Sequence, residues 1–220
     1  MKKKFIVFGD SWTWGADLGP DEKTYGELIA ERKGMEFQNY AEVSTAPEHM
    51  ILQLHEMINT SPFTDTNYTA LFSVTSLTRF MYFSKYAKFD KKYGTNCGYV
   101  AWNGTEKDDL ASEMYYKHIH SDKLDNFKFY TTVMTLQTLC KEHNINDYYA
   151  LSFSTVDWNN NIFTGVDRHK FWNKGHTNFL EMFGCKIVDP KNKYFKGTTG
   201  GHPNQLGHEL IAQHLSEWIQ

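Results

Sequence analysis

The stretch "FIVFGDSWTWG", residues 5–15, decides the fold. Its first four residues, Phe5 to Phe8, are all apolar, as is typical of a parallel strand that is covered on both faces. Gly9 allows the backbone to turn sharply where this strand ends. Ser11 then lies just beyond the carboxyl end of the strand, at the edge of an α/β sheet where ligands bind. The stretch therefore predicts a buried parallel strand that presents a serine hydroxyl at one rim of a sheet.

Apolar runs and amphipathic segments alternate along the rest of the chain, which indicates a parallel sheet with helices on both faces. We predict a three-layer α/β/α sandwich with a flavodoxin-like strand order, built as a single domain of residues 1–220. An aromatic, aperiodic stretch at about residues 80–106 is expected to be an irregular insertion. The expected strands are 4–8, 35–40, 68–74 and 147–153 with a fifth at 185–188, and the expected helices are 21–33, 47–58, 110 or 122 to 143, and 203–219.

The composition excludes several classes of function. A formal net charge of -3 gives no basic footprint for nucleic acid or for an anionic membrane. Cys97, Cys140 and Cys185 are odd in number and widely spaced, which argues against disulfides and indicates a reducing compartment. Among the ten histidines, neither the pair His118 and His120 nor the pair His49 and His55 has a spacing that suits one helix face, so we expect no metal and no cofactor.

The first residues, Met-Lys-Lys-Lys, resemble the charged start of a signal peptide. The apolar run that follows is too short for the hydrophobic region of such a peptide, and no stretch reaches the length of a transmembrane helix. A cytoplasmic protein is therefore expected.

A second stretch, "GGHPNQLGHELIAQHL" at residues 200–215, changes the interpretation of the first. Gly-Asp-Ser alone is an ordinary turn sequence, in which Ser11 could simply cap the next helix. His202, however, stands just before Pro203, a residue that starts helices well, and two glycines precede it. If the last helix packs beside the first strand, His202 can act as a general base for Ser11. We expect His208 to have a structural role, at the surface or as a cap.

The two stretches together resemble the SGNH (GDSL-type) hydrolase superfamily. Gly9-Asp10-Ser11 matches its first block and His202-Pro203 matches its last block. The resemblance implies an α/β/α sandwich in which the serine is the nucleophile and the histidine the base. It also implies an oxyanion hole made of the serine N–H, the N–H of a glycine after the second strand and an asparagine side chain after the third.

The sequence departs from the superfamily's pattern at three supporting positions. Ser44 stands where the glycine is expected, and a backbone donor survives there if the local conformation does not demand glycine. Thr75 or Ser76 would replace the asparagine amide with a hydroxyl. Thr199 stands where an aspartate would precede His202, so Thr199 or a backbone carbonyl would orient the histidine in a Ser-His dyad.

Three neighbours of the serine turn have alternative roles. Asp10 is expected to support the turn by accepting backbone N–H bonds, and the alternative is a direct catalytic role. Trp12, like Trp14, lines a substrate pocket or packs in the core. Arg79, just past the third strand, binds substrate or forms a structural ion pair.

These features predict a serine esterase that acts on small acyl esters, with carbohydrate O-acetyl groups among its candidate substrates. The alternative is an SGNH-fold binding or structural module with little turnover. A flavodoxin-like binder of phosphate or nucleotide ranks last, since no glycine-rich phosphate motif is present. The motif style also resembles SGNH-type proteins of bacteriophages, which would place the protein in a host cytoplasm or a virion.

Overall fold

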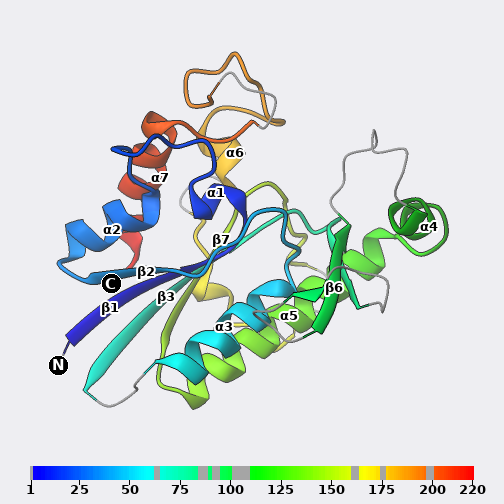
Figure 1. Cartoon of the computed structure of the whole chain (residues 1–220), viewed down its shortest axis with the longest axis horizontal. Coiled ribbons are helices and arrows are strands. Elements are labelled where there is room, and N and C mark those ends of the chain that lie inside the picture. Colours follow the sequence, from blue (N-terminus) through cyan, green and yellow to red (C-terminus); the bar gives the residue numbers. More distant parts are fainter. Residues whose placement is uncertain are drawn as a thin grey trace.

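Four parallel strands form the centre of the molecule (Figure 1). The computed structural model describes residues 2–61, 65–83, 89–90, 95–100, 110–159, 164–173, 177–196 and 201–220. The four parallel strands lie in the order β2-β1-β3-β7 in the sheet. Because β7 is the fourth of these strands along the chain, this is the first part of the flavodoxin-like order, which confirms the predicted fold class. The strands are β1 (Lys2–Phe8), β2 (Glu36–Asn39), β3 (Thr66–Val74) and β7 (Asn146–Leu151).

The fifth strand expected at 185–188 does not form. Gly184 takes a left-handed φ of 74°, and the Cys185 amide donates to the carbonyl of Leu180, so the chain turns back at this point. Only one parallel bridge, from Phe171 to Tyr149, adds to the β7 edge within the part of the chain that the structure describes. The apolar residues of 185–188 therefore belong to an irregular segment.

The two faces of β1 point into two separate hydrophobic clusters, as strict alternation requires. Phe5 and Val7 pack against α2 (Tyr25–Lys33), α6 (Phe179–Met182) and α7 (Gln205–Trp218). Ile6 and Phe8 pack against α3 (His49–Thr60) and α5 (Asp122–Glu142). All four side chains are fully buried, which explains why this short segment is apolar throughout.

Local signals in the sequence set the helix ends. Thr24 and Glu27 form a reciprocal capping box at the start of α2, and Gly34 ends the helix with a left-handed φ of 64°. Asn204 caps α7 by accepting from the amide of Gly207. Ser121 caps α5, which confirms the alternative in which the long helix begins at 122, and residues 110–118 form the separate helix α4 (Leu110–His118).

The insertion after β3 is more regular than its aperiodic sequence indicates. Its described strands are β4 (Phe80–Phe83), β5 (Phe89–Asp90) and β6 (Thr95–Val100). They pair antiparallel in the order β4-β6-β5 and, with α4, lie to one side of the main sheet (Figure 1). The expectation of an irregular insertion at about 80–106 is therefore wrong for these strands. In the part of the chain that the structure describes, no helix is both long and apolar enough to cross a membrane.

Candidate active site

The serine turn directly follows β1, and only glycine fits its first position. Gly9 has a φ of 154°, and a Cβ at this residue would lie 2.4 Å from Thr13 Oγ1 and 2.8 Å from the Ser73 carbonyl oxygen. Ser11 begins the one-turn helix α1 (Ser11–Trp14), which Asp10 caps by accepting from the Trp12 amide at 3.1 Å. Sequence reasoning expected this supporting role for Asp10.

Ser11 is largely buried, with 8% of the residue exposed. The described residues provide no hydrogen-bond partner for its Oγ or for its amide. Within the described ranges, nothing competes with a ligand for either group.

Gln53 holds the Gly9 peptide from the other side. Its Oε1 accepts from the Gly9 amide and its Nε2 donates to the Gly9 carbonyl, both at 3.2 Å. Gln53 is fully buried on the apolar face of α3, between Met50 and Leu54. Sequence reasoning missed this residue, and the signal was a lone amide among apolar helix neighbours, since a buried polar group requires partners.

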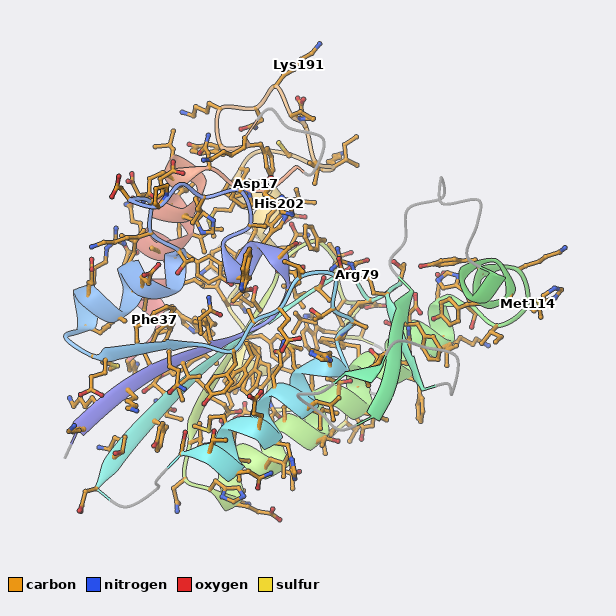
Figure 2. The ribbon with its side chains drawn as sticks, in the orientation of Figure 1. Asp17, Phe37, Arg79, Met114, Lys191 and His202 are labelled. Atoms are coloured by element: carbon orange, nitrogen blue, oxygen red, sulfur yellow. The ribbon has the colours of Figure 1, made fainter. Side chains whose placement is uncertain are left out.

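His202 lies at the same rim as the serine turn and contacts the loop that follows α1. Its Nδ1 is 2.8 Å from Asp17 Oδ2, and the two side chains are labelled side by side above α1 in Figure 2. The backbone connects this contact to the serine, because the amides of Gly15 and Ala16 both donate to the Ser11 carbonyl. No hydrogen bond joins Ser11 Oγ to His202 among the described residues.

Three more contacts connect the loop after α1 to the C-terminal segment. Glu22 and Lys196 form an ion pair at 2.6 Å. The hydrogen bond from the Gly19 amide, followed by the Lys196 ammonium, lowers the pKa of the Glu22 carboxyl. The Lys23 amide donates to Gln205 Oε1 at 2.8 Å.

His208 provides the third of these contacts from inside the fold. Its Nδ1 accepts from the Tyr25 amide at 3.1 Å, so it satisfies an N–H at the start of α2. The histidine is fully buried, and burial lowers the pKa of its imidazole to about 3. The expected capping role is confirmed, whereas the alternative surface position is wrong.

The expected oxyanion donors differ in availability. Ser44 is exposed and adopts a φ of 59°, a left-handed conformation that glycine takes more readily than serine. No described residue accepts a hydrogen bond from its amide. Thr75 instead donates its hydroxyl proton to Asp10 Oδ2 at 2.6 Å. In this arrangement the Thr75 hydroxyl has no proton left for an oxyanion.

Arg79 is engaged in structural contacts near the serine turn. Its guanidinium donates to the Thr45 carbonyl at 3.1 Å, lies 3.5 Å from Asp10 Oδ2 and stacks over the Phe153 ring. Its side chain is 20% exposed, whereas the Asp10 side chain is fully buried. These contacts favour the structural ion pair over substrate binding, since a buried carboxylate requires a charge partner.

The two tryptophans of the serine turn lie in different environments. Trp12 is 2% exposed and its ring contacts Phe153, Phe183 and Phe195. This position corresponds to the core-packing alternative, so Trp12 offers little surface to a substrate. Trp14, by contrast, is 53% exposed on the same turn and is available to stack against a ligand.

A cavity of about 650 Å³ opens at the carboxyl ends of β3 and β7. Phe153, which contacts the Trp12 ring at a centroid distance of 4.5 Å, forms the wall nearest the serine turn. Carboxylates predominate among the charged side chains of the lining. They are Asp122, Asp125, Asp157 and Glu181, against the single cation Lys186.

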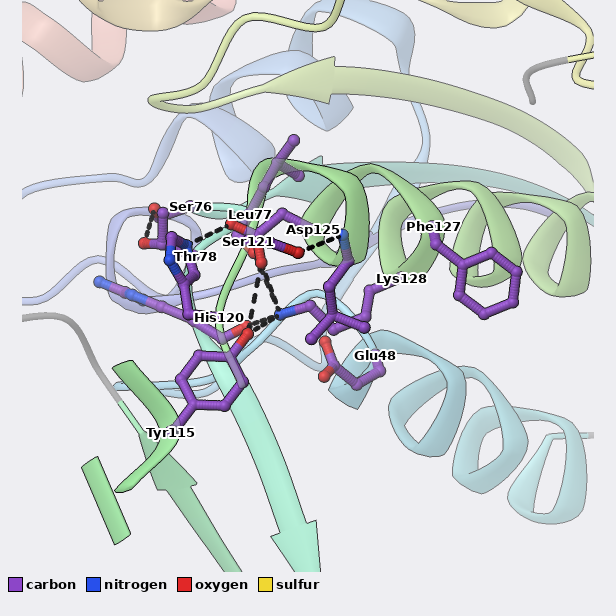
Figure 3. A network of polar contacts seen from close by, with 12 residues as sticks. Glu48, Ser76, Leu77, Thr78, Tyr115, His120, Ser121, Asp125, Phe127 and Lys128 are labelled. Atoms are coloured by element: carbon purple, nitrogen blue, oxygen red, sulfur yellow. Dashed lines mark hydrogen bonds and ion pairs between the residues drawn. The ribbon is translucent and has the colours of Figure 1, made fainter. Parts of the chain in front are cut away.

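Lys128 is at the centre of a network of polar contacts that includes Leu77 and Asp125, two residues of the cavity lining (Figure 3). Its ammonium donates to the carbonyls of Leu77 and Arg79 and to the Tyr115 hydroxyl, and it forms an ion pair with Asp125 at 3.2 Å. The segment after β3 is thereby attached to α5, and the Asp125 charge is partly balanced.

Two further predictions concern the support of His202 and the binding of a metal ion. Thr199, expected as a support for His202, lies outside the described residues. Within the described ranges, no group of three or more His, Cys, Asp and Glu side chains is arranged to hold a metal ion.

Comparison with known proteins reveals likeness in structure alone. No family model and no curated protein matches the chain in sequence. Esterase EstA from Pseudoalteromonas sp. has a TM-score of 0.51 at 13% identity, over 98% of this chain and 96% of that one. A G-D-S-L family protein from Desulfitobacterium hafniense DCB-2 has a TM-score of 0.50 at 10% identity, over 98% of this chain and 99% of that one.

Acetyl xylan esterase Est2A from Butyrivibrio proteoclasticus has a TM-score of 0.52 at 11% identity, over 99% of this chain and 63% of that one. At these identities the comparisons establish the fold, and the predicted resemblance is confirmed at that level.

Proposed function

Since the chain has the SGNH hydrolase fold, we propose that it is a serine ester hydrolase that uses Ser11 and His202 on small acyl esters. One observation carries the proposal. The loop that follows Ser11 contacts His202 through Nδ1, which leaves Nε2 of the imidazole available as a base at the rim that carries the serine turn.

In the first half of the reaction Ser11 Oγ attacks the acyl carbonyl carbon and His202 Nε2 takes the hydroxyl proton. The tetrahedral intermediate collapses, the bond to the alcohol oxygen breaks, and the imidazolium returns the proton to that oxygen. The alcohol leaves and the acyl group remains on Ser11. His202 must reach Ser11 Oγ in this step, and such catalytic contacts often tighten only when substrate binds.

In the second half of the reaction the same steps occur with a water molecule in place of the Ser11 hydroxyl as the attacking group. His202 Nε2 takes a proton from the water as its oxygen attacks the acyl carbon. The Ser11–acyl bond then breaks, and the proton passes to Ser11 Oγ. The products are a carboxylic acid and the free enzyme.

The amides of Ser11 and Ser44 are the proposed donors to the oxyanion, since neither amide is used by the described residues. Thr75 would join them only if its hydroxyl left Asp10. The loss of one oxyanion donor typically lowers kcat by on the order of 10²- to 10³-fold. Modest turnover is therefore expected.

The cavity beside Trp12 supports a neutral, hydroxyl-rich alcohol group such as a sugar. Its carboxylates accept hydrogen bonds from hydroxyl groups and repel anions. Acetylated carbohydrate fits this chemistry, and Est2A, which shares the fold, acts on acetyl xylan. The cytoplasmic location and the phage-type origin stay predictions.

Fluorophosphonate labelling tests the proposal directly. A structure of EstA was obtained inhibited by monoethylphosphonate, so phosphonate chemistry suits this fold. The folded protein is expected to gain one adduct at Ser11, and Ser11→Ala should lose both the adduct and the esterase turnover. Ser216→Ala is the matched control, because that hydroxyl donates to the Ala212 carbonyl inside α7. Absence of labelling at Ser11 in the folded protein would overturn the proposal.

The alternative, a binding module with the same fold, is favoured by one observation. The Thr75 hydroxyl is committed to Asp10, so in this arrangement Thr75 does not serve as the third oxyanion donor. If this alternative holds, the wild-type esterase rate will equal that of Ser11→Ala.

A further inference from the structure

We propose that Asp17 is the carboxylate that orients His202, so the loop after the serine supplies an acid that the sequence does not provide before the histidine. The inference rests on the ester hydrolase proposed above. The two residues are 185 positions apart, and Asp17 Oδ2 lies 2.8 Å from His202 Nδ1 (Figure 2). Asp17 is a positioning residue, because it acts through the imidazole.

The nitrogen that Asp17 contacts is the one a positioning carboxylate must contact. A carboxylate accepts only, so Nδ1 carries the proton that it binds. In neutral imidazole the other nitrogen, Nε2, then holds the lone pair and is the base. Asp17 thereby selects the tautomer that can take a proton from Ser11 Oγ.

The backbone around Asp17 sets its position relative to the serine. Asp17 has a φ of 67°, a left-handed conformation that aspartate and asparagine tolerate better than most residues. Gly15, with a φ of 90°, and Ala16 both donate their amides to the Ser11 carbonyl. The turn that ends α1 therefore places the carboxylate a few residues beyond the nucleophile.

The segment that carries His202 is held just as firmly. Gly201 has a φ of 59°, and the His202 carbonyl accepts from the Lys196 amide at 3.0 Å. Pro203 forms an antiparallel bridge with Phe195. The Glu22–Lys196 pair then connects this segment to the Asp17 loop.

The contact between Asp17 and His202 is expected to contribute little to the stability of the fold. The Asp17 side chain is 41% exposed and that of His202 is 19% exposed, and exposed ion pairs typically contribute about 0 to 1 kcal/mol to stability. Removal of the carboxylate should therefore leave the fold intact. Its cost should appear in catalysis instead.

Asp17→Asn is the decisive variant, because asparagine keeps the left-handed backbone and removes only the charge. Asp65→Asn is its matched control, since Asp65 is also exposed with a φ of 64° and lies at the start of β3. Asp17→Asn is expected to lower kcat by on the order of 10²- to 10⁴-fold with KM changed by less than about threefold. Asp65→Asn should match the wild type in both constants, and both variants should keep its melting temperature.

Two further measurements separate positioning from structure. In ¹⁵N spectra at alkaline pH, the neutral His202 ring should carry its proton on Nδ1 in the wild type and on Nε2 in Asp17→Asn. In a His202→Ala background, Asp17→Asn should cause no additional loss of activity, because its effect passes through the missing ring. Additive losses, or an unchanged tautomer in Asp17→Asn, would overturn the inference.

The failure of the proposed function would look different. It would appear as a wild type that lacks both phosphonate labelling and turnover above Ser11→Ala. The tautomer spectrum needs no turnover, so it decides the role of Asp17 in that case as well.

Discussion

Gly201 precedes His202 and limits how closely that segment can pass the rest of the protein. A Cβ at Gly201 would lie 2.2 Å from Val188 Cγ1, and its φ of 59° is left-handed. Backbone and side-chain packing therefore both demand glycine beside the proposed base.

Gly201→Ala is expected to destabilise the fold by about 2 to 4 kcal/mol, as the sum of left-handed strain and overpacking. Gly34→Ala is the matched control, since Gly34 has a φ of 64° and a Cβ added there would have no atom within 4 Å. It should cost only about 1 to 2 kcal/mol. Urea unfolding of both variants measures the difference, and equal losses would contradict the packing argument.

Phe153 and the carboxylates beside it lie where β3 and β7 end, so the cavity is a property of these elements together with α5. Asp122 and Asp157 are both exposed at the cavity and lie on different elements. Their charges act on a ligand mainly through water, where each contributes a few tenths of a kcal/mol at separations of about 8 Å.

The cavity charge predicts a preference among esters. The wild type should hydrolyse a neutral acetyl ester with a higher kcat/KM than a matched anionic one. The double variant Asp122→Asn with Asp157→Asn should raise kcat/KM for the anionic ester by about two- to fivefold and leave the neutral ester unchanged. The gain should shrink in high salt, and an equal change for both esters would argue against an electrostatic cause.

An element could be predicted from the sequence when the residues that determine it lie within or next to that element. The apolar run of β1 and the capping residues of α2 and α7 are local, and these elements lie close to their predicted positions. The residues at 185–188 are also mostly apolar, apart from Lys186, but Gly184 turns the chain before a strand can pair. The role of Asp17 could not be predicted from the sequence, because its contact with His202 joins two loops and loops have no periodic residue pattern.

The first and last parts of the chain meet in the contact between α2 and α7, and His208 lies inside it. Its ring stacks on Tyr25 at a centroid distance of 5.6 Å. Burial is the main cause of its lowered pKa of about 3, while Glu22 raises that pKa and His202 and Lys196 lower it. The folded molecule therefore keeps this imidazole neutral in mild acid.

This burial predicts an acid-sensitive fold. The unfolded chain binds a proton at His208 below a pKa of about 6.5, whereas the folded chain does so only near 3. Stability therefore rises with pH between these values, by up to about 1.4 kcal/mol per pH unit, and this contribution is fully present above 6.5.

His208→Asn should flatten the slope of unfolding free energy against pH between 4 and 6.5, as measured by denaturant titration. His118→Asn, a change at an exposed histidine, should preserve the slope. A slope that stays steep in His208→Asn would assign the acid sensitivity to other groups.

The contact between Asp17 and His202 spans 185 positions, which has a consequence for synthesis on the ribosome. At about 5 to 20 residues per second, roughly 10 to 40 s pass between the emergence of the turn that carries the proposed nucleophile and that of the proposed base. If the chain is the ester hydrolase proposed above, a nascent polypeptide is chemically silent until α7 docks, and the onset of ester cleavage would time that docking.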